Sequence, residues 1–351
     1  MKIWFDILTP KQLLFFESMI QRAKSEHDIL FTSRDYKEVT DLIRIRNLHP
    51  TLVGKYGGKE LEKKLDASLM RAKLLIKLID EFQPDITVSF CSPEASLISF
   101  NFGIHHIAFC NAPHSEGVCR LAVPLLNKLL IPGHIPKQSF GRYGLEHNHI
   151  VQYAAMDEFL IVRNKPAFIW DKKSIGLSDS KKTILFRTYE TQASYVQSHT
   201  DMEAILDSIV DNFSDCNIVI STRYSEQTEH LQEKYSDVAV TLESSFDSGA
   251  ILAGCDLLIG SGGTMTTEAV LRGVPVVSYD AVPNMDEKYL VNRGDLIRAK
   301  SPDKIIKASS EILSKDKRVF VERADCLLSE MEDPYDTLVA QIDEYARTIQ
   351  Y

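Results

Sequence analysis

The strongest constraint on the fold is the regular alternation of short apolar runs with longer stretches of helical periodicity. The runs typical of buried strands are 2–8, 27–32, 85–90, 104–109, 129–131 and 149–153, then 182–186, 217–221, 238–242, 257–259, 274–278 and 296–299. Helical periodicity marks 11–24, 36–48, 59–82, 118–126, 200–213, 246–253, 286–293, 302–314, 317–331 and 335–351. This alternation predicts an α/β protein whose parallel sheets are covered by helices.

The chain is long enough for two domains, with 351 residues. The alternation is interrupted at Lys165-Pro166 and by the polar stretch 171–182. We therefore predict one Rossmann-like domain over 1–165, a second over 166–333, and a final helix over 334–351. Ligands bind such sheets beyond the carboxyl ends of the strands, so two facing domains predict a cleft between them.

Charge and cysteine content narrow the class of protein. The formal net charge of −9 argues against nucleic-acid binding, which favours basic surfaces. The six cysteines lack the C-x-x-C spacing of zinc and redox sites, and we expect a reducing cytoplasm. Asp6 breaks the first apolar run, so a signal peptide is not expected, and no run approaches the ~20 apolar residues of a membrane span.

The most informative single stretch is 260–269, which reads Gly-Ser-Gly-Gly-Thr-Met-Thr-Thr-Glu-Ala between an apolar run and a helical pattern. Its glycines allow positive φ and close approach of a ligand to the backbone. We expect the Ser/Thr run to cap the helix and the helix start to bind an anion such as a phosphate. Glu268 lies about one turn further on, within reach of ligand hydroxyls. The alternative is a tight turn without a ligand.

These residues also carry a family resemblance. The stretch 260–268, followed by Gly273-Val274-Pro275, resembles the nucleotide-sugar motif of GT-B glycosyltransferases, including the enzymes that add N-acetylglucosamine to a lipid-linked cell-wall precursor. The non-hydrolysing UDP-N-acetylglucosamine 2-epimerases share that architecture. Over its whole length the chain is most similar to the domain-of-unknown-function 354 family, mainly archaeal proteins described as glycosyltransferases. The segments that carry this similarity are 6–12, 32–36, 92–95, 113–116, Arg120, Pro124, 193–195 and 286–290.

The resemblance implies a GT-B fold of two Rossmann-like domains facing across a cleft. The first domain would hold the acceptor, the second would bind the nucleotide sugar, and the helix 334–351 would cross back to the first. Two positions depart from the family pattern. Gln12 stands where many members carry a histidine, and Asn111 stands where many carry an acidic residue. A catalytic role at either position is therefore open.

The donor-site residues expected in the second domain lie after its strands. The resemblance implies that Gly262, Gly263 and Thr264, beside Ser261, hold the diphosphate and that Glu268 binds the ribose hydroxyls. Arg187 and Arg223 each follow a strand, where an arginine neutralises a diphosphate leaving group. The alternative for each is a surface arginine paired with a carboxylate. Asp286 and Glu287 follow the next strand, where related enzymes bind sugar hydroxyls.

The residues expected to act on the acceptor lie in the first domain. His114, in a polar loop with Glu116 two residues later, is the candidate general base, and a structural hydrogen bond is its alternative role. Glu94 begins a helix, where it binds acceptor or complements the helix dipole. Asp6 is a weaker candidate for either role. His105 and His106 are expected to contribute to packing.

These expectations describe a glycosyltransferase that moves a sugar from a UDP-linked donor to a glycan or lipid-linked acceptor. No D-x-D motif stands in a suitable loop, so we expect metal-independent chemistry with no cofactor beyond the nucleotide-sugar substrate. One alternative is a sugar epimerase that uses carboxylates among Asp6, Glu94, Glu116 and Glu190. Another is a non-catalytic nucleotide-sugar-binding subunit. Helix 59–82 is expected to be amphipathic. Its apolar side comprises Leu61, Leu65, Leu69, Ala72, Leu75, Ile76 and Ile79. Its basic side, with Lys63, Lys64, Arg71, Lys73 and Lys77, is expected to be solvated, with contact to anionic lipid headgroups at the inner membrane face as its alternative.

Overall fold

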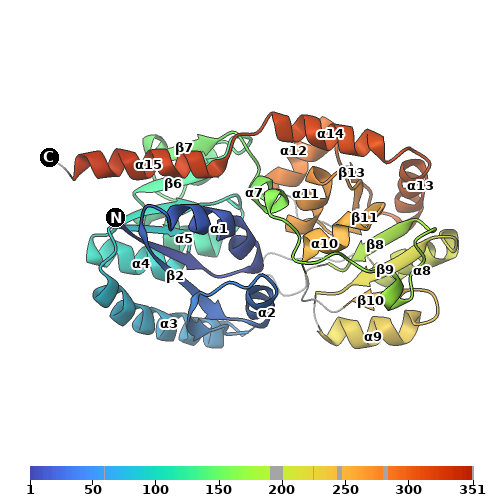
Figure 1. The fold of residues 1–351 in the computed structure, drawn as a ribbon, viewed down its shortest axis with the longest axis horizontal. Helices are drawn as coiled ribbons and strands as arrows, with labels where there is room; N and C mark the ends of the chain where they lie inside the picture. Colours follow the sequence, from blue (N-terminus) through green and yellow to red (C-terminus); the bar gives the residue numbers. More distant parts are fainter. Residues whose placement is uncertain (59, 190–200, 224, 243–246, 280–283, 350–351) are drawn as a thin grey trace. The chain divides into compact units, whose positions relative to one another are not determined.

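A computed structural model describes the chain except residues 59, 190–200, 224, 243–246, 280–283 and 350–351 (Figure 1). The described residues form two compact units, each an α/β structure with its own sheet. Unit 1 comprises Met1–Asn164 together with Met331–Tyr351, and unit 2 comprises Lys165–Glu330. No helix within the described ranges is long and apolar enough to cross a lipid bilayer.

Unit 1 is built on a seven-stranded sheet in the order β3-β2-β1-β4-β5-β6-β7, in which every neighbouring pair is parallel. The strands are β1 (Lys2–Ile7), β2 (Asp28–Asp35), β3 (Thr51–Lys55), β4 (Ile86–Ser89), β5 (His105–Phe109), β6 (Lys128–Pro132) and β7 (Ile150–Tyr153). The main helices are α1 (Pro10–Ala23), α2 (Lys37–Ile45), α3 (Leu61–Phe82), α4 (Pro93–Phe102), α5 (Glu116–Ala122), α6 (Gln138–Gly141), α7 (Glu158–Arg163) and α15 (Pro334–Thr348). The strand order reverses direction between β1 and β4, and a Rossmann-like sheet binds ligands at such a point.

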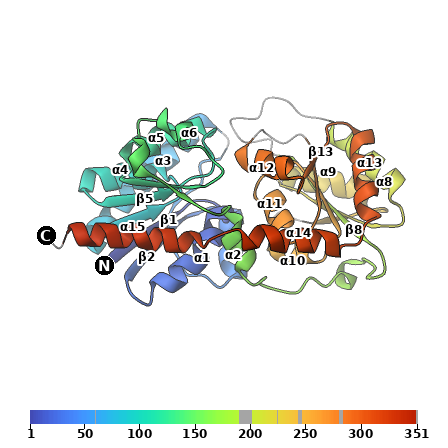
Figure 2. The same ribbon diagram turned by 90° about the horizontal axis from the view of Figure 1, so that it is seen from above.

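The last helix, α15, packs on unit 1 (Figure 2). Arg22 of α1 donates to Asp333 at 2.7 Å, and Lys128 at the start of β6 pairs with Glu344 at 3.1 Å. The imidazole of His105 stacks on the ring of Tyr345 with centroids 4.1 Å apart. Burial, with the nearby Lys128 ammonium, lowers the pKa of His105 to about 4, so the imidazole packs in its neutral form.

Unit 2 contains a six-stranded parallel sheet in the order β10-β9-β8-β11-β12-β13. Its strands are β8 (Thr183–Arg187), β9 (Asn217–Ser221), β10 (Val240–Leu242), β11 (Leu257–Gly260), β12 (Val276–Ser278) and β13 (Ile297–Arg298). Its helices are α8 (Met202–Asn212), α9 (Ser225–Tyr235), α10 (Ser248–Ala253), α11 (Thr264–Leu271), α12 (Met285–Arg293), α13 (Pro302–Leu313) and α14 (Arg318–Ser329). Both sheets confirm the predicted α/β class with parallel strands.

Four elements differ from the sequence-based expectation. No strand was predicted where β3 lies, an edge strand of five residues that pairs with β2 from Thr51 onward. The helices α6, α7 and α9 were not predicted either. An edge strand with Gly54 in its interior and mostly exposed side chains lacks the continuous apolar run by which buried parallel strands are recognised.

The long helix α3 buries the C-terminal part of its expected apolar side together with one basic residue. Its buried residues are Arg71, Ala72, Leu75 and Ile79. The side chains of Leu65 and Leu69, expected in the apolar stripe, are each 59% exposed. They lie about 120° and 160° around the helix axis from Arg71. The helix turns Arg71 inward because that guanidinium pairs with a buried carboxylate.

Candidate functional site

The carboxyl ends of three neighbouring strands in unit 2 meet at one edge of the sheet. Arg187 at the end of β8 is in register with Ser221 at the end of β9, and on the other side of β8 the strand β11 ends at Gly260. The structure therefore brings three predicted features together at this edge. They are Arg187 at the end of β8, the end of β9 just before Arg223, and the end of β11, which leads into the glycine motif. This is the edge where ligands bind in parallel sheets.

The glycine motif forms a sharp turn between β11 and α11. Gly262 and Gly263 have φ of 82° and 85°, a region that other residues adopt only with strain. Gly263 is the N-cap of α11 and makes no side-chain cap hydrogen bond. The predicted capping by the Ser/Thr run is therefore wrong. The first N–H groups of a helix have no intrahelical acceptor, so without a side-chain cap they remain directed outward from the turn.

Arg223 lies above this helix start. Its Nη2 is 3.8 Å from the position that a Cβ atom on Gly263 would occupy. The side chain is held by Thr188, whose carbonyl oxygen accepts from Arg223 Nε at 3.0 Å and whose Oγ1 accepts from the Arg223 backbone N–H at 3.1 Å. Gln227 Oε1 in turn accepts from Thr188 Oγ1 at 2.9 Å. A guanidinium and a helix N-terminus thus present positive charge at the same place.

Arg187 is fixed across the ends of two strands. Its Nη1 donates to the Ser221 hydroxyl and, at 2.8 Å, to the carbonyl oxygen of Thr222. Its Cβ lies 3.8 Å from the position of a Cβ on Gly260. Tyr279 donates its hydroxyl to the Arg187 carbonyl oxygen at 2.9 Å. Arg187 therefore stands beside the glycine turn in a defined conformation, half-buried at the edge of the sheet.

Glu268 is more enclosed than a free ligand carboxylate. It is 1% exposed, and its two oxygens accept from the Ser248 hydroxyl at 2.6 Å and from Arg272 Nε at 2.9 Å. Burial raises the pKa of Glu268, and the Arg272 guanidinium partly offsets that effect. A ribose hydroxyl can contact this carboxylate if it replaces the Ser248 hydroxyl as a hydrogen-bond donor.

Two carboxylates begin helix α12. Asp286 is 8% exposed in the first turn. Glu287 is 3% exposed, and its Oε1 accepts from the Ser278 hydroxyl at the end of β12 at 2.7 Å. Within the described residues its Oε2 is buried without a hydrogen-bond partner. Asn284 caps the same helix by accepting from the Glu287 backbone N–H at 2.8 Å. Glu287 therefore retains an unused acceptor at the carboxyl end of β12.

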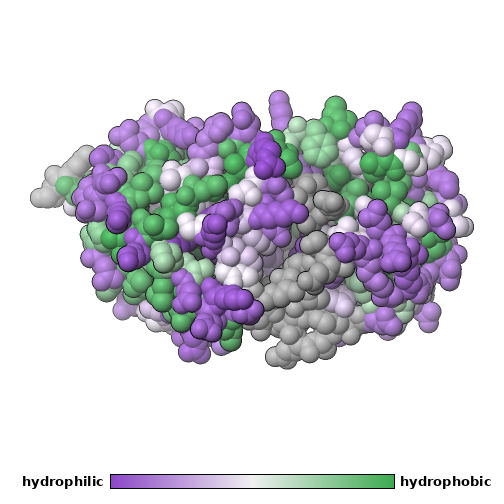
Figure 3. All heavy atoms as spheres, turned by 90° about the horizontal axis from the view of Figure 1, so that it is seen from below, coloured by the Kyte–Doolittle hydropathy of each residue, from purple (hydrophilic) through white to green (hydrophobic). Residues whose placement is uncertain are grey.

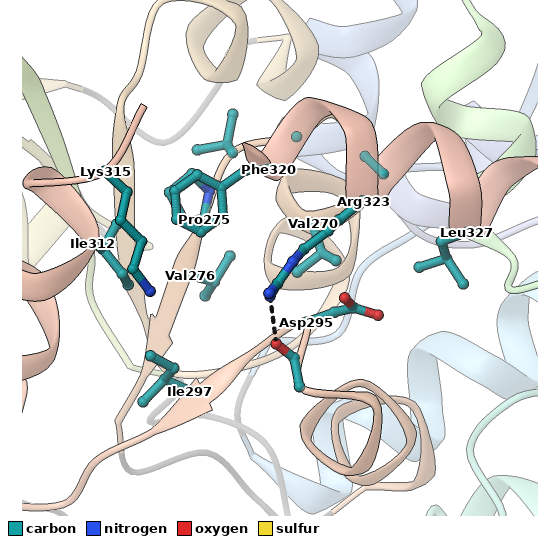
Figure 4. A pocket seen from close by; sticks show the side chains of 14 residues that line it. Val270, Pro275, Val276, Asp295, Ile297, Ile312, Lys315, Phe320, Arg323 and Leu327 are labelled. Atoms are coloured by element: carbon teal, nitrogen blue, oxygen red, sulfur yellow. Dashed lines mark hydrogen bonds between the residues drawn. The ribbon is translucent and has the colours of Figure 1, made fainter. Parts of the chain in front are cut away.

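The Gly273-Val274-Pro275 segment plays a different part from the rest of the motif. Gly273 has φ of 70°, and a Cβ there would lie 2.8 Å from the Val321 Cα in α14, so this glycine allows two helices to pack closely. The segment lines a pocket whose other walls include Phe320 and Arg323 (Figure 4). Because it precedes β12, the pocket lies at the amino end of that strand, opposite the carboxyl edge where the glycine turn lies.

A buried charge network fills the corresponding edge of unit 1. Asp6, near the end of β1, is fully buried and accepts from Arg71 Nη1 at 3.1 Å and Nη2 at 2.5 Å. The hydroxyls of Ser92 and Thr32 also donate to it, at 2.7 and 2.6 Å. Burial opposes ionisation, but Arg71 and the two hydroxyls together lower the pKa of Asp6. Asp6 is therefore an ion-pair partner of Arg71, and its role as a weaker site candidate stays a prediction.

Glu94 belongs to the same network. It lies in the first turn of α4, 8% exposed, where its Oε1 accepts from the Ser68 hydroxyl at 2.9 Å. Its Oε2 lies 3.4 Å from the Ser92 hydroxyl, which donates at the shorter distance to Asp6, and 3.8 Å from Arg71 Nη1. The carboxylate therefore has a hydroxyl on each oxygen and a guanidinium nearby, close to the point where the strand order reverses.

His114 and Glu116 follow the neighbouring strand, β5. His114 is half-buried in the turn before α5, and its carbonyl oxygen accepts from the Glu116 backbone N–H at 2.9 Å. The Glu116 carboxylate is exposed and lies 3.6 Å from Arg142 and 3.7 Å from Arg120. Glu94 and Glu116 thus belong to separate clusters, one around Asp6 and the other around Arg142.

The two positions that depart from the family pattern have distinct surroundings. Gln12 is buried, and its Oε1 accepts from the Leu8 N–H at 2.7 Å, so it fastens the loop between β1 and α1. Asn111 is half-buried immediately after β5. His106 is fully buried, as expected for a packing role, with its Nε2 2.9 Å from the Ser89 hydroxyl. Glu190 and the segment 193–195 lie outside the described residues.

Several residues that shape the site were not predicted. Thr188 orients Arg223, Ser248 and Arg272 enclose Glu268, and Arg71 neutralises Asp6. The pairing of Arg272 with Glu268 could have been predicted, because a glutamate and an arginine four residues apart on a helix are neighbours. The roles of Thr188 and Arg71 could not, because their partners come from other elements of the fold.

Comparison with known proteins identifies relatives along the full chain. The family model described as "Protein of unknown function (DUF354)" matches residues 1–347. "Uncharacterized protein MJ0665" of Methanocaldococcus jannaschii is 27% identical over 356 residues, covering 98% of each chain. These matches agree with the family resemblance found in the sequence.

Solved structures with the same fold are more distant in sequence. The UDP-GlcNAc 2-epimerase of Neisseria meningitidis bound to UDP-GlcNAc has a TM-score of 0.73 at 14% identity, covering 98% of this chain and 100% of that one. The spinosyn rhamnosyltransferase SpnG complexed with spinosyn aglycone has a TM-score of 0.59 at 12% identity, also covering 98% and 100%. At these identities the likeness is one of fold, and it confirms the predicted GT-B class.

Proposed function

The chain belongs to the family described as protein of unknown function DUF354, and on that premise we propose that it is a glycosyltransferase with a UDP-linked sugar as donor. The donor diphosphate would bind at the carboxyl edge of the unit 2 sheet. One observation carries this proposal: the Arg223 guanidinium lies directly above Gly263 at the uncapped start of α11. The epimerase of the same fold is bound to UDP-GlcNAc, a donor of the proposed kind.

The chemistry of this edge suits a diphosphate leaving group. Negative charge develops on the diphosphate as its bond to the anomeric carbon breaks, and groups already in place for that charge lower the barrier. The start of α11, with Gly262, Gly263 and Thr264, supplies backbone N–H groups, and Ser261 lies beside them. Arg223 and Arg187 supply fixed positive charge. We propose that these groups serve without a metal or other cofactor, so activity should survive EDTA.

The remaining donor contacts follow from the neighbouring carboxylates. We propose that the ribose hydroxyls exchange with the Ser248 hydroxyl on Glu268, which keeps its ion pair with Arg272. The sugar hydroxyls would donate to Asp286 and to the unused Oε2 of Glu287. A carboxylate with a free buried acceptor gains a charge-assisted hydrogen bond from such a hydroxyl.

Unit 1 would hold the acceptor. A neutral imidazole can take the acceptor hydroxyl proton as the acceptor oxygen attacks the anomeric carbon, and His114 is proposed for that role. Glu94, with hydroxyls on both oxygens, is proposed to position the acceptor, and Glu116 to act beside His114. Asp6 is not included, because Arg71 and two hydroxyls already occupy its carboxylate.

We propose a lipid-linked acceptor reached at the inner face of a membrane, for which the apolar surface of unit 1 offers a contact. Large apolar side chains are exposed on three helices of that unit: Leu61, Leu65, Leu69, Met70, Leu74 and Ile76 on α3, Leu97, Phe100 and Phe102 on α4, and Val118 and Leu121 on α5. Hydrophobic residues gather on the unit 1 side of the face in Figure 3. Exposed apolar areas of this kind mark sites that contact lipid or protein.

The main alternative is a UDP-sugar 2-epimerase, since an epimerase of this fold matches with the higher TM-score of the two structures. Proton transfer at the sugar ring requires carboxylates free to act as acid and base. Among the four candidates the Asp6 carboxylate is already paired with Arg71, and Glu190 lies outside the described residues, so Glu94 and Glu116 are the described carboxylates left for that chemistry. The other alternative is a binding subunit with no activity of its own.

Incubation of the pure protein with UDP-N-acetylglucosamine, with and without cell lipid extract, separates these functions. Release of UDP that depends on the extract supports transfer, and a C2 epimer formed without extract supports epimerisation. Binding with neither product supports the subunit, and absence of binding refutes the donor site. A His114→Asn variant that releases UDP at the wild-type rate would remove His114 from the mechanism.

A further inference from the structure

One cation of unit 1 takes no part in the network around Asp6. Arg34 lies near the end of β2, half-buried, and its Nε donates to the carbonyl oxygen of Leu8 at 3.1 Å. Its guanidinium carbon is 5.5 Å from the ring centroid of Tyr36 and 4.9 Å from that of Tyr56. The two rings are themselves 4.6 Å apart. One hydrogen bond and two aromatic rings therefore hold the guanidinium in place.

The terminal nitrogens of Arg34 differ from those of its neighbour Arg71. Within the described chain, Nη1 and Nη2 of Arg34 make no hydrogen bond or ion pair, whereas Arg71 uses both on Asp6. The carboxylate whose field reaches Arg34 is Glu94, and that group already contacts Ser68, Ser92 and Arg71. Arg34 thus keeps the forked end of its guanidinium available.

The position of Arg34 is costly for an uncompensated charge. Burial lowers the pKa of Arg34, and the repulsion of Arg71 adds to that effect while Glu94 opposes it. A guanidinium still remains protonated at neutral pH. A partly buried cation without its own carboxylate is stabilised mainly by the Leu8 carbonyl and the faces of the tyrosine rings. An arriving anion would complete this arrangement.

The strand order places this cation beside a ligand-binding position. β2 neighbours β1, and β1 neighbours β4 at the point where the order reverses. Arg34 near the end of β2, Leu8 after β1 and Glu94 after β4 therefore belong to one edge of the sheet. Parallel sheets bind ligands at this edge, and arginine recognises carboxylate and phosphate groups through two parallel hydrogen bonds.

We propose that Arg34, braced by Tyr36 and Tyr56, is the anchor of an oxyanion-binding site in unit 1. The site takes a carboxylate or phosphate group on the terminal nitrogens of Arg34. Its existence does not depend on the activity proposed above. The identification of its occupant as the acceptor does rest on that proposed function, and it implies an acceptor that carries a negative group near the reacting hydroxyl.

The test is titration of the full chain with inorganic phosphate and, separately, with acetate at constant ionic strength. The variant is Arg34→Met, which keeps the length of the stem without the charge. The matched control is Arg44→Met, which removes an arginine from α2 whose side chain is 79% exposed. Since the start of α11 is unchanged in both variants, phosphate bound there contributes equally to each titration.

At least tenfold weaker binding of one or both anions by Arg34→Met than by Arg44→Met supports the site. Tighter binding of phosphate by the wild type indicates a phosphorylated occupant, and tighter binding of acetate indicates a carboxylate. Equal anion binding by the two variants overturns the proposal. If Arg34→Met does not fold, Arg34→Lys keeps the charge without the fork. Its anion affinity should fall several-fold, and an unchanged affinity would likewise overturn the site.

The Arg34 Nε–H resonance, assigned by its loss in Arg34→Lys, gives a direct readout in the wild type. It should shift during the anion titration with the same midpoint as the binding isotherm. Unchanged UDP binding in Arg34→Met separates this site from unit 2. If the wild type does not bind UDP, the donor site in unit 2 is refuted. The anion titration still tests the Arg34 site in that case.

Discussion

Replacement of Arg71 by methionine tests the buried charge network of unit 1. Asp6 accepts two hydrogen bonds from this guanidinium and one each from Ser92 and Thr32. Charge-assisted hydrogen bonds contribute about 1.5–3 kcal/mol each, and removal of one partner of a buried ion pair costs about 3–5 kcal/mol. Arg71→Met should therefore lower the free energy of unfolding of unit 1 by about 3–5 kcal/mol at pH 7.

The assay can be restricted to unit 1. The chain has two tryptophans, Trp4 in unit 1 and Trp170 in unit 2. Trp4 Nε1 donates to Thr32 at 2.8 Å, and Thr32 donates to Asp6, so Trp4 fluorescence reports on the network itself. Urea unfolding in a Trp170→Phe background then follows unit 1 alone. Arg44→Met, which breaks an exposed pair with Asp41, should cost less than about 1 kcal/mol.

The dependence on pH gives the sharper test. In the wild type the pKa of Asp6 lies below its unfolded value of 3.8, so its stabilisation is present above pH 3.8 and is lost as the pH falls through the folded pKa. Without Arg71, burial is expected to raise the folded pKa above 3.8, so the variant should gain stability as the pH falls from neutral. The stability gap should therefore narrow between pH 7 and pH 4. A gap below about 1 kcal/mol at pH 7, or one that does not narrow, would refute this reasoning.

Three further predictions concern the two sheets and the exposed helices. Burial lowers the pKa of His106 to about 3 from 6.5, so the free energy of unfolding should fall by about 1.4 kcal/mol per pH unit as the pH drops below 6.5. In urea unfolding, His106→Asn should make this dependence on pH less steep. Gly263→Ala should weaken UDP binding measured by calorimetry, because Gly263 has a positive φ and lies near Arg223. Gly273→Ala should lower the unfolding temperature without changing the affinity for UDP, because the added Cβ would clash with Val321 of α14. If α3 contacts lipid, Leu65→Gln should reduce sedimentation with lipid vesicles at least several-fold, and equal sedimentation of variant and wild type would exclude that contact.

The alternating pattern was sufficient to predict both parallel sheets, because buried parallel strands read as continuous apolar runs. β3 was missed because an edge strand with Gly54 lacks such a run. On α3 the burial of Ala72, Leu75 and Ile79 agrees with the periodicity, but the burial of Arg71 was not predicted, because it depends on the pairing with Asp6, 65 residues away. Local periodicity indicates a helix and its apolar side, whereas a charge pair that forms across the fold adds a basic residue to the buried set.

The candidate site shows the same division. The glycine turn and the strand-end arginines were predicted, since strand ends can be located from the sequence and the sheet brings them together. The hydrogen bond from Ser248 to Glu268 could not be predicted, because that serine begins a different helix. The ion pair of Glu268 with Arg272 could have been predicted from their spacing of four residues on one helix. The acceptor-side roles of His114, Glu94 and Glu116 remain predictions for the variants to decide.

The most direct test of the donor site is calorimetric titration with UDP of the wild type, Arg223→Met and Arg318→Met. Arg318, 84% exposed on α14, is a matched loss of one arginine in unit 2. Loss of a charge-assisted contact of about 1.5–3 kcal/mol predicts roughly tenfold to a hundredfold weaker UDP binding by Arg223→Met. Arg318→Met should bind UDP as the wild type does. Absence of UDP binding by the wild type, or equal affinities in the two variants, would contradict a diphosphate site above Gly263.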